Sequence, residues 1–267
     1  MKLWKKVLAA VTAGVLCVGS VGVTGLQSVL ESAGMVLSAS AEEGTYGNLS
    51  YGVTNAGEAE ITGCDMGVTS VEIPAEIDGK PVTSIGNNAF RDCTSLTEIK
   101  MPDSVTNIGN GTFYGCTSLT GITIPDGVTS VGFQTFSGCI SLKEIAIPDS
   151  VTSIGESAFS GCTSLTKIAI PNSVTDIGGF VFSNCTNLES ITLSDHLTSV
   201  GGYTFSGCTS LSAITIPDSV TSIGQAAFSG CTSLTEITIP NSVTSMEEII
   251  FSDCTNLADV TLSNSMT

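Results

Sequence analysis

The sequence has little positive charge and few of the residues on which catalytic and nucleic-acid-binding sites depend. Its 267 residues include 8 Lys and Arg against 25 Asp and Glu, which gives a formal net charge of −17, and they include one His and one Trp. A polyanion of this kind repels nucleic acid and anionic membrane surfaces, so both classes of partner are excluded. Cationic partners, divalent ions and simple solubility are compatible with the charge, and solubility requires the fewest assumptions.

The sequence also lacks the short motifs that mark common cofactor and metal sites. No glycine-rich phosphate loop, dinucleotide fingerprint or calcium loop is present. The cysteines form no C-x-x-C pair of the kind that zinc sites use. His196, the single histidine, takes the place of Ser or Gly in a turn and is expected to be an exposed turn residue rather than a general base. We therefore expect no catalytic residue, no metal and no cofactor.

Residues 1–41 are predicted to be a secretory signal peptide. Lys2, Lys5 and Lys6 precede an uncharged apolar run, and the small residues 39–41 form a cleavage site before Glu42. Cleavage there leaves 5 Lys and Arg and 24 Asp and Glu, a formal charge of −19. The expectation is a secreted or cell-surface protein that meets the membrane only transiently, during export.

Two alternatives to cleavage follow from the same segment. The uncharged stretch reaches Leu30, which is long enough to span a bilayer as a retained anchor. Cys17 is a candidate for a lipid anchor, but Leu16 stands before it, where lipoprotein signals carry Gly or Ala. The cleaved signal peptide is the interpretation that fits the order of basic, apolar and small residues.

Three residue types recur every 23 residues, which is the signature of a repeat architecture. The phenylalanines are Phe90, Phe113, Phe136, Phe159, Phe182, Phe205, Phe228 and Phe251. The cysteines are Cys93, Cys116, Cys139, Cys162, Cys185, Cys208, Cys231 and Cys254. The leucines are Leu96, Leu119, Leu142, Leu165, Leu188, Leu211, Leu234 and Leu257. Because three types keep the same phase, the chain is predicted to be a stack of similar units.

Each unit has the pattern of a strand, a turn and a second extended segment. In one copy, Ile99 and Met101 alternate with outward neighbours in a short strand, which Pro102 ends because it has no N–H for the ladder. Val105 and Ile108 form a second inward pair on a short extended segment. A short helical turn around the phenylalanine is expected to close the unit.

Two further columns of the repeat are predicted to lie in turns. Gly, Asn or Asp, the residues that tolerate positive φ, stand directly before every cysteine, so a left-handed backbone is expected there. They are Asp92, Gly115, Gly138, Gly161, Asn184, Gly207, Gly230 and Asp253. Asp or Asn also follows most prolines, which indicates turn capping, with a weak cation ladder as the alternative. That column holds Asp103, Asp126, Asp149, Asn172, Asp195, Asp218, Asn241 and Asn264.

A single unit cannot bury enough apolar surface to fold alone, so stability must come from stacking neighbouring units. The pattern L-x-x-I-x-I-P-x-x-V-x-x-I-G-x-x-A-F-x-x-C resembles the BspA-type (Treponema-type) leucine-rich repeat. The resemblance implies a mainly β solenoid, a right-handed coil with parallel strands on the concave face and short helical or extended turns on the convex face. It also implies a bacterial surface or secreted protein. Some members of the family are adhesins that bind host proteins or other cells.

The two ends depart from the repeat. Residues 42–63 are predicted to be an amino-terminal cap, and residues 64–267 to be a solenoid of about nine 23-residue repeats. Cys64 precedes Cys93 by 29 residues, and the extra residues include an Asp-Gly pair that suggests a tight turn. Near the other end, residues 245–250 lose the usual Gly, and residues 263–267 follow without an evident cap. An uncapped end exposes an apolar layer and a strand edge, so self-association there, or a longer relative, is expected.

The cysteine row has two interpretations. Export favours disulfides, and adjacent layers bring sulfurs close together. However, the exported chain has nine cysteines, an odd number, and in-register stacking points every Cβ the same way, which is poor disulfide geometry. We therefore expect a ladder of buried thiols that fill the core as small apolar side chains.

The outward face of the predicted strands is the candidate binding surface. One column varies between copies: Glu98, Gly121, Glu144, Lys167, Ser190, Ala213, Glu236 and Asp259. The next is nearly uniform: Lys100, Thr123, Ala146, Ala169, Thr192, Thr215, Thr238 and Thr261. Variation within a constant frame indicates specificity, so the expected ligand contacts are Glu98, Lys100, Glu144, Lys167, Ser190, Glu236 and Asp259. Neither column holds an aromatic anchor of the kind common at binding hot spots, which indicates weak or multivalent binding.

Three hypotheses about function follow. The best supported is a secreted or cell-surface binding protein, adhesive in character, whose partner is a protein or cell-surface ligand. The second is a structural spacer with no dedicated ligand, which the uniform column favours. The third is an enzyme or a fragment of one, which no residue pattern in the sequence supports.

Overall fold

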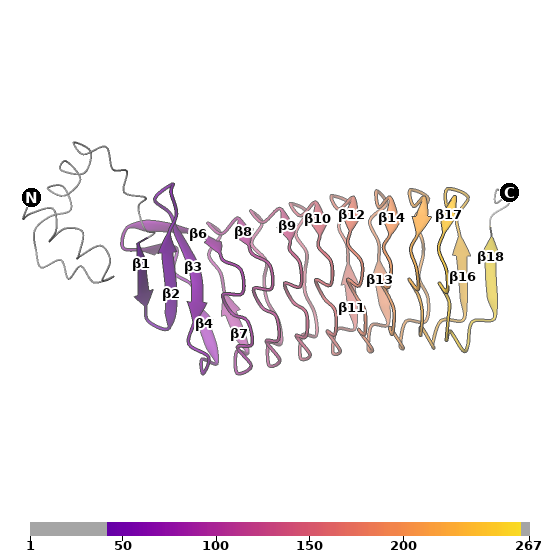
Figure 1. Cartoon of the computed structure of the whole chain (residues 1–267), viewed down its shortest axis with the longest axis horizontal. Helices are drawn as coiled ribbons and strands as arrows, with labels where there is room; N and C mark the ends of the chain where they lie inside the picture. Colours follow the sequence, from indigo (N-terminus) through magenta and orange to yellow (C-terminus); the bar gives the residue numbers. More distant parts are fainter. Residues whose placement is uncertain (1–41, 263–267) are drawn as a thin grey trace, which may run out of the picture. The chain divides into compact units, whose positions relative to one another are not determined.

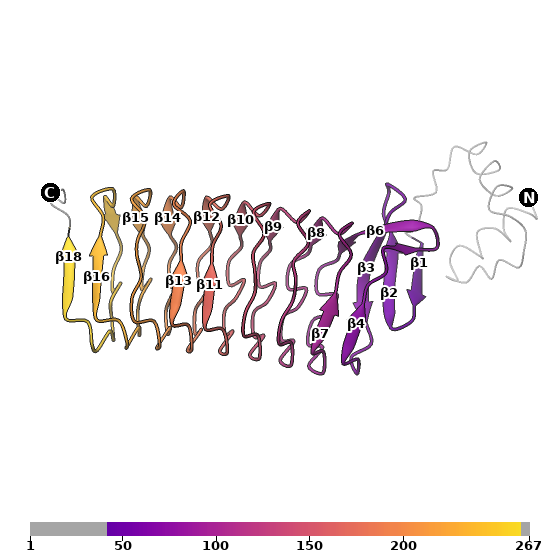
Figure 2. The same ribbon diagram turned by 180° about the vertical axis from the view of Figure 1, so that it is seen from behind.

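The structure, a computed structural model, describes residues 42–262. These residues form a mainly β solenoid of about nine turns, in agreement with the predicted fold class (Figure 1). The predicted signal peptide at residues 1–41 and the final residues 263–267 lie outside the described part of the chain. Each turn of the solenoid contributes one short segment to each of two rows of parallel strands, which Figures 1 and 2 show from opposite sides.

The first row of strands, here called the strand face, is the one predicted as the binding surface. Its members are β4 Ser70–Glu72, β7 Glu98–Lys100, β11 Lys167–Ala169, β13 Ser190–Thr192, β16 Glu236–Ile239 and β18 Asp259–Leu262. They pair in parallel as β4 with β7, β11 with β13 and β16 with β18. Between these pairs the ladder is interrupted, and at residues 121–124 and 144–147 it is reduced to one bridge, from Thr123 to Ala146.

The second row is built from the extended segments that follow each Pro-containing turn. Its members are β6 Lys80–Ile85, β8 Asn107–Ile108, β9 Ser130–Val131, β10 Ser153–Ile154, β12 Asp176–Ile177, β14 Ser199–Val200, β15 Ser222–Ile223 and β17 Ser245–Met246. Pairing is in register over one repeat, as in Ser153 with Asp176 and Ile154 with Ile177. A translation of 23 residues therefore carries each strand onto its neighbour, which confirms the predicted stacking.

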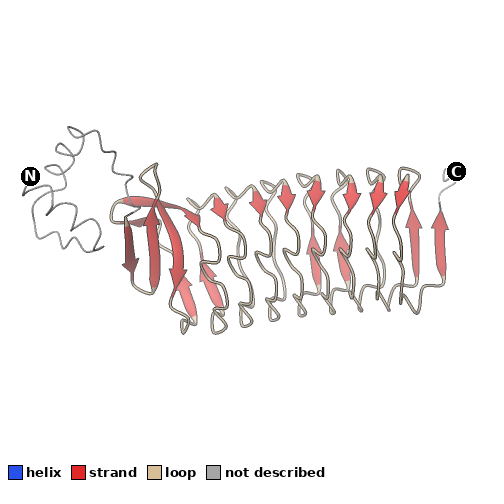
Figure 3. Ribbon diagram, viewed as in Figure 1, coloured by secondary structure: helices blue, strands red, loops and turns tan. Residues whose placement is uncertain are grey.

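The described residues contain no helix, so the predicted helical turn around each phenylalanine is wrong (Figure 3). Reverse turns form around the phenylalanines instead. In one of them the Cys116 N–H donates to the Phe113 carbonyl at 3.1 Å. Within residues 42–262 there is accordingly no helical segment able to cross a membrane.

The predicted left-handed positions before the cysteines are confirmed. All eight have positive φ, from 56° at Asp92 to 74° at Gly138 and Gly207. A second left-handed column, four residues earlier, was not predicted: Asn88, Gly111, Gln134, Ser157, Phe180, Tyr203, Ala226 and Ile249. Most of these residue types do not favour positive φ, so composition gave no signal. The conformation is imposed by the two tight turns that bracket each phenylalanine.

The core is a continuous column between the two rows of strands. The eight repeat phenylalanines stack with ring centroids 5.4–5.7 Å apart and interplanar angles of 4–16°. The predicted inward residues Ile99, Val105 and Ile108 are buried, and Met101 is half-buried. Burial of each layer against the next supplies the stability that an isolated unit lacks.

The residues before the first regular repeat form an antiparallel sheet that continues the second row. Strands β1 Glu43–Tyr46, β2 Leu49–Val53 and β3 Ala59–Cys64 are antiparallel neighbours, and β3 then pairs in parallel with β6. The predicted Asp-Gly turn joins β5 Glu76–Ile77 to β6, with φ of 51° at Asp78 and 73° at Gly79. The Tyr51 hydroxyl donates to the Asp78 carboxylate at 2.5 Å and so links this turn to β2.

The last described layer is less covered than those before it. Met246, Ile249, Val260 and Leu262 have exposures of 36%, 56%, 37% and 50%. Glu247 takes the place of the usual Gly, and its carboxylate accepts the Gln225 N–H at 2.8 Å.

Candidate binding surface

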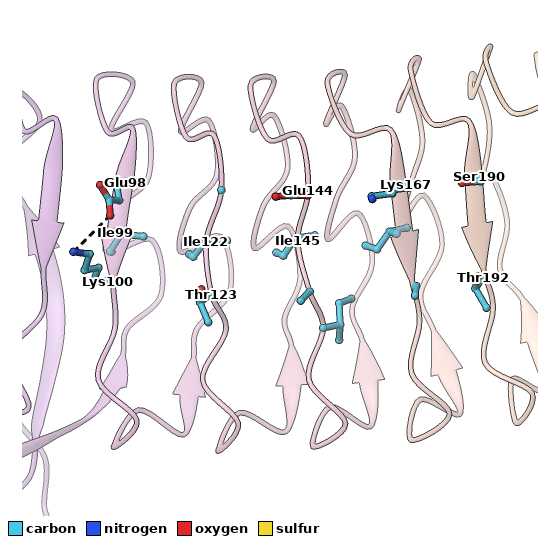
Figure 4. A pocket seen from close by; sticks show the side chains of 15 residues that line it. Glu98, Ile99, Lys100, Ile122, Thr123, Glu144, Ile145, Lys167, Ser190 and Thr192 are labelled. Carbon is cyan, nitrogen blue, oxygen red and sulfur yellow. Dashed lines mark ion pairs between the residues drawn. The ribbon is translucent and has the colours of Figure 1, made fainter.

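The strand face carries a shallow groove that crosses several repeats. The groove has a volume of about 970 Å³ and extends from Glu98 to Thr192. Its floor consists of the repeat isoleucines Ile99, Ile122, Ile145 and Ile168, whose neighbours along the strand point outward (Figure 4). The groove covers the part of the row where strand pairing is interrupted.

The structure brings the predicted contact residues onto this one surface. Glu98, Glu144, Lys167 and Ser190 lie in one row, with the ribbon of Ile122 and Thr123 between Glu98 and Glu144, and Lys100 lies in a second row with Thr123 and Thr192 (Figure 4). Every predicted residue is exposed, namely Glu98, Lys100, Glu144, Lys167, Ser190, Glu236 and Asp259. The sequence analysis therefore identified residues that are exposed on one surface. That a ligand binds to this surface is a proposal.

Charge is unevenly distributed along the strand face. Of the five Lys and Arg residues after residue 41, Lys100 and Lys167 line the groove, and Lys143 directly precedes Glu144. Lys100 Nζ lies 3.8 Å from Glu98 Oε1. The lysines therefore concentrate cationic groups on one stretch of a molecule that is otherwise strongly acidic.

A second hollow, of about 760 Å³, continues the strand face toward β18. Asp218 and Glu236 line it together with Ala213, Thr215 and Thr238, and no Lys or Arg is among the lining residues. Passing from β7 to β18, the face therefore changes from mixed charge to purely acidic.

The repeated Ser and Thr residues have structural partners between layers. The Ser104 hydroxyl donates to the Val82 carbonyl at 2.7 Å, and Ser150 donates to Val128 in the same way. His196 is exposed in its turn, as predicted, with Nδ1 2.8 Å from the Asn172 carbonyl oxygen. In residues 42–262 no three His, Cys, Asp or Glu side chains converge to hold a metal ion.

The cysteines form the predicted inner row. Cys93, Cys116, Cys139, Cys162, Cys185, Cys208 and Cys231 are buried, whereas Cys64 and Cys254 are half-buried. Each thiol from Cys116 onward donates to the carbonyl of the phenylalanine 26 residues earlier, at 3.0–3.2 Å. Burial raises the pKa of Cys139 and Cys185 to about 12, because the thiolate would lose its hydration.

A stacked aromatic pair on the turns of two adjacent repeats, with Phe180 exposed and Tyr203 half-buried, was missed by the sequence analysis. Phe180, 39% exposed, and Tyr203 stack with ring centroids 4.6 Å apart and an interplanar angle of 3°. Phe133 is also exposed, and the Arg91 guanidinium lies 4.2 Å from the centre of the Tyr114 ring. The available signal was two consecutive copies with Gly-Gly followed by an aromatic residue, at 178–180 and 201–203.

Comparison with known proteins gives a consistent result. A family model described as the BspA type leucine rich repeat region matches residues 62–189 and 175–267, with six copies. The crystal structure of a leucine-rich repeat protein from T. pallidum is similar, with 34% sequence identity and a TM-score of 0.66, over 72% of this chain and 91% of that chain.

Two further crystal structures resemble the chain more distantly. One is of a leucine-rich repeat protein from Bacteroides ovatus, with 28% identity and a TM-score of 0.48, covering 84% of this chain and 77% of that chain. The other is of a leucine-rich cell surface protein from Faecalibacterium prausnitzii, with 26% identity and a TM-score of 0.38, covering 85% and 96%. No curated protein is significantly similar to this chain in sequence.

Proposed function

Because the chain belongs to the BspA-type leucine-rich repeat family, we propose that it is a secreted or cell-surface protein that binds a protein or cell-surface ligand through its strand face. In this proposal the protein acts by adhesion or protein–protein contact and has no catalytic step. The observation that carries the proposal is the groove of about 970 Å³ along the strand face, whose lining includes the variable column with Glu98, Glu144 and Lys167.

The side chains of the groove support recognition by polar contacts above an apolar floor. Glu98, Glu144 and Lys167 present charges of both signs along the groove, while Gly121 and Ala146 leave room between them. A Cβ added at Gly121 would meet no atom within 4 Å, so that position is open to an incoming group. Exposed charges in a shallow surface contribute little each, so affinity must come from several contacts at once.

A structural spacer is the second candidate function. The column of Thr123, Ala146, Ala169, Thr192 and Thr215 is nearly uniform and offers little information for selective recognition. A spacer needs only the stacking of layers, and it would tolerate any outward residue that suits a strand.

Substitution of the variable column tests the proposal. The variant Glu98→Ala, Glu144→Ala, Lys167→Ala and Glu236→Ala removes four charges from the strand face. A matched control carries Arg91→Ala, Asp149→Ala, Glu156→Ala and Asp176→Ala, which removes the same number of acids and bases elsewhere. Binding of each purified chain to immobilised host extracellular-matrix proteins and to whole bacterial cells is compared with that of the unaltered chain.

We expect the strand-face variant to lose at least tenfold in apparent affinity and the control to keep it. If both variants bind equally well, the binding site is not on the strand face. If only the double variant Phe180→Ser and Tyr203→Ser loses binding, the site includes the aromatic pair. If the unaltered chain captures none of these probes, the spacer function is favoured.

A further inference from the structure

The second hollow of the strand face, which has a volume of about 760 Å³, is acidic at both of its ends. Glu236 begins β16 at one end, in the same repeat column as Ala213. Asp218 lies at the other end, in the turn column that follows the prolines. The volume falls within the range of about 300–1,000 Å³ that is usual for ligand sites, so the hollow can accommodate a segment of a partner.

A second carboxylate lies beside Glu236. Strands β16 and β18 pair in parallel with Glu236 opposite Asp259, so these two side chains leave neighbouring strands on the same side. Like charges opposite each other in a sheet are destabilising. The three ion pairs among residues 42–262 involve neither of these carboxylates, nor that of Asp218. A cationic group bound here would therefore relieve a repulsion that the described part of the chain leaves uncompensated.

The hollow also contains a buried hydroxyl group that has no hydrogen-bond partner among the described residues. In four other copies the serine of this column donates to a carbonyl of the preceding layer, as from Ser219 to Leu197 at 2.7 Å. The Ser242 hydroxyl is buried and makes no such bond. A buried polar group without a partner costs free energy. Because Ser242 lines the hollow, a group that enters the hollow can supply the missing partner.

The middle of the hollow is lined by uncharged side chains that suit a peptide. Exposed threonines from three successive layers provide hydroxyl groups that can donate and accept hydrogen bonds, namely Thr215, Thr238 and Thr261. Ile214 and Ile237 precede two of these threonines and are buried. The hollow therefore combines hydroxyl groups that can bind the main chain of a peptide with carboxylates that can bind its basic side chains.

We propose that this hollow binds an extended basic segment of a protein partner, with lysine or arginine side chains near Asp218 and near Glu236 and Asp259. Charge complementarity determines the choice of occupant, because an acidic segment would meet these carboxylates while no Lys or Arg lines the hollow. The inference rests on the proposed function, in which the strand face binds a protein ligand, and it adds the chemistry of the bound segment.

An acetylated and amidated peptide of alternating lysine and threonine is the probe for the test. Isothermal titration calorimetry at low ionic strength measures its binding to the folded full chain, and a peptide with every lysine acetylated serves as the neutral comparison. We expect the lysine peptide to bind and the neutral peptide not to bind. Asp218→Asn with Glu236→Gln should raise Kd by about four- to twentyfold, because each exposed charge pair contributes about two- to fivefold.

A matched variant separates a site from general attraction between a polycation and an acidic protein. Asp149→Asn with Glu156→Gln makes the same change of net charge outside the hollow, and Asp149 belongs to the same repeat column as Asp218. Asn occupies that column in other copies, as at Asn172, so the substitution suits the fold. We expect this control to bind the lysine peptide as the unaltered chain does.

Two serine variants test the role of the buried hydroxyl. Ser242→Ala removes a group that has no partner, so it should raise Kd by about twofold without lowering the melting temperature. Ser219→Ala removes the hydrogen bond to Leu197, so it should lower the melting temperature by about 2–4 °C and leave Kd unchanged. The opposite assignment of the two effects would contradict the role given to Ser242.

The inference is overturned if the two charge variants weaken peptide binding equally, which would show a delocalised attraction, or if the unaltered chain does not bind the lysine peptide. It is also overturned if free spermine or calcium ion binds as tightly as the peptide and displaces it, because the hollow would then be a cation site without a peptide. Absence of peptide binding in a chain that still captures matrix proteins or cells would refute this inference and leave the proposed function standing.

Discussion

Each buried thiol in the ladder is held neutral by its surroundings. Burial is the main cause of the raised pKa of Cys139, Cys185 and Cys231, each about 12 against an ordinary value of 9.0, and the hydrogen bond to the preceding repeat offsets part of the effect. An unfolded chain ionises these thiols at lower pH than the folded chain does. The stability that they contribute is therefore complete below about pH 9 and is lost as pH rises toward about 12.

Alkaline conditions should consequently unfold the protein. Above pH 9 we expect the free energy of unfolding to fall by about 1.4 kcal/mol per pH unit for each buried thiol. Urea denaturation at pH 8, 9.5 and 10.5 measures the slope, and Cys139→Ala should show a shallower decline than the unaltered chain. Parallel declines in the two proteins would contradict this assignment.

Left-handed backbone at residues that do not favour it is a second feature at the residue scale. Gln134 has φ of 54°, a conformation that costs a residue with a Cβ roughly 1–2 kcal/mol. Gln225 belongs to the neighbouring column and is not among the residues with positive φ. The same substitution should therefore have opposite effects at the two sites.

Gln134→Gly is expected to raise the free energy of unfolding by about 0.5–1 kcal/mol, because glycine adopts positive φ without strain. Gln225→Gly is expected to lower it by a similar amount, because there glycine only adds entropy to the unfolded chain. Thermal unfolding followed by circular dichroism compares the two variants. Changes of the same sign at both sites would show that backbone strain is not the cause.

At the scale of the repeat, a glycine begins the phenylalanine turn in every copy from Gly86 to Gly224, where neighbouring layers come into close contact. A Cβ added at Gly178 would lie 2.4 Å from the backbone nitrogen of Glu156 in the preceding layer. Because this nitrogen belongs to the backbone, it cannot move aside as the end of a flexible side chain could. Gly121 on the strand face faces open space. Comparing substitutions at these two glycines therefore distinguishes a requirement of packing from a general preference for glycine.

Gly178→Ala should destabilise the solenoid by about 1–3 kcal/mol through overpacking, whereas Gly121→Ala should be neutral or slightly stabilising. Chemical denaturation of both variants gives the comparison. A neutral Gly178→Ala would mean that the layers can move apart at little cost. In the last described copy Glu247 takes this position beside the layer that holds Gln225, so that copy departs from the rule.

At the scale of the whole molecule, the acidic charge opposes compactness. Residues 42–267 carry a formal charge of −19, and the ion pairs found among residues 42–262 are three, each on the surface. Surface pairs contribute little, so they do not offset the repulsion between carboxylates. Salt should therefore stabilise the protein by screening that repulsion.

The melting temperature at pH 7 is expected to rise between 20 mM and 500 mM NaCl, by about 2–4 °C for each kcal/mol of repulsion that is screened. At pH 4 many carboxylates are protonated, so the same change of salt should have a smaller effect. Differential scanning calorimetry under the four conditions measures both shifts. A melting temperature that falls with salt at pH 7 would show that attractive pairs dominate.

The fold and the exposure of the candidate site could be predicted from the sequence because the repeat makes local patterns unambiguous. Alternation at Ile99 and Met101 and the 23-residue phase of Phe113 and Cys116 place the same side chains inside in every layer. The column that includes Gly115 could be predicted as left-handed because only Gly, Asn and Asp occupy it. Each of these inferences uses the sequence pattern alone, within one repeat or compared between repeats.

Tertiary structure decided what depends on the fit between layers. Gln134 and Phe180 adopt positive φ because the turns on either side require it, not because their side chains prefer it. A periodic sequence determines which side chains face inward, since that follows from local geometry, whereas the contacts between neighbouring layers depend on how closely two backbones approach in space.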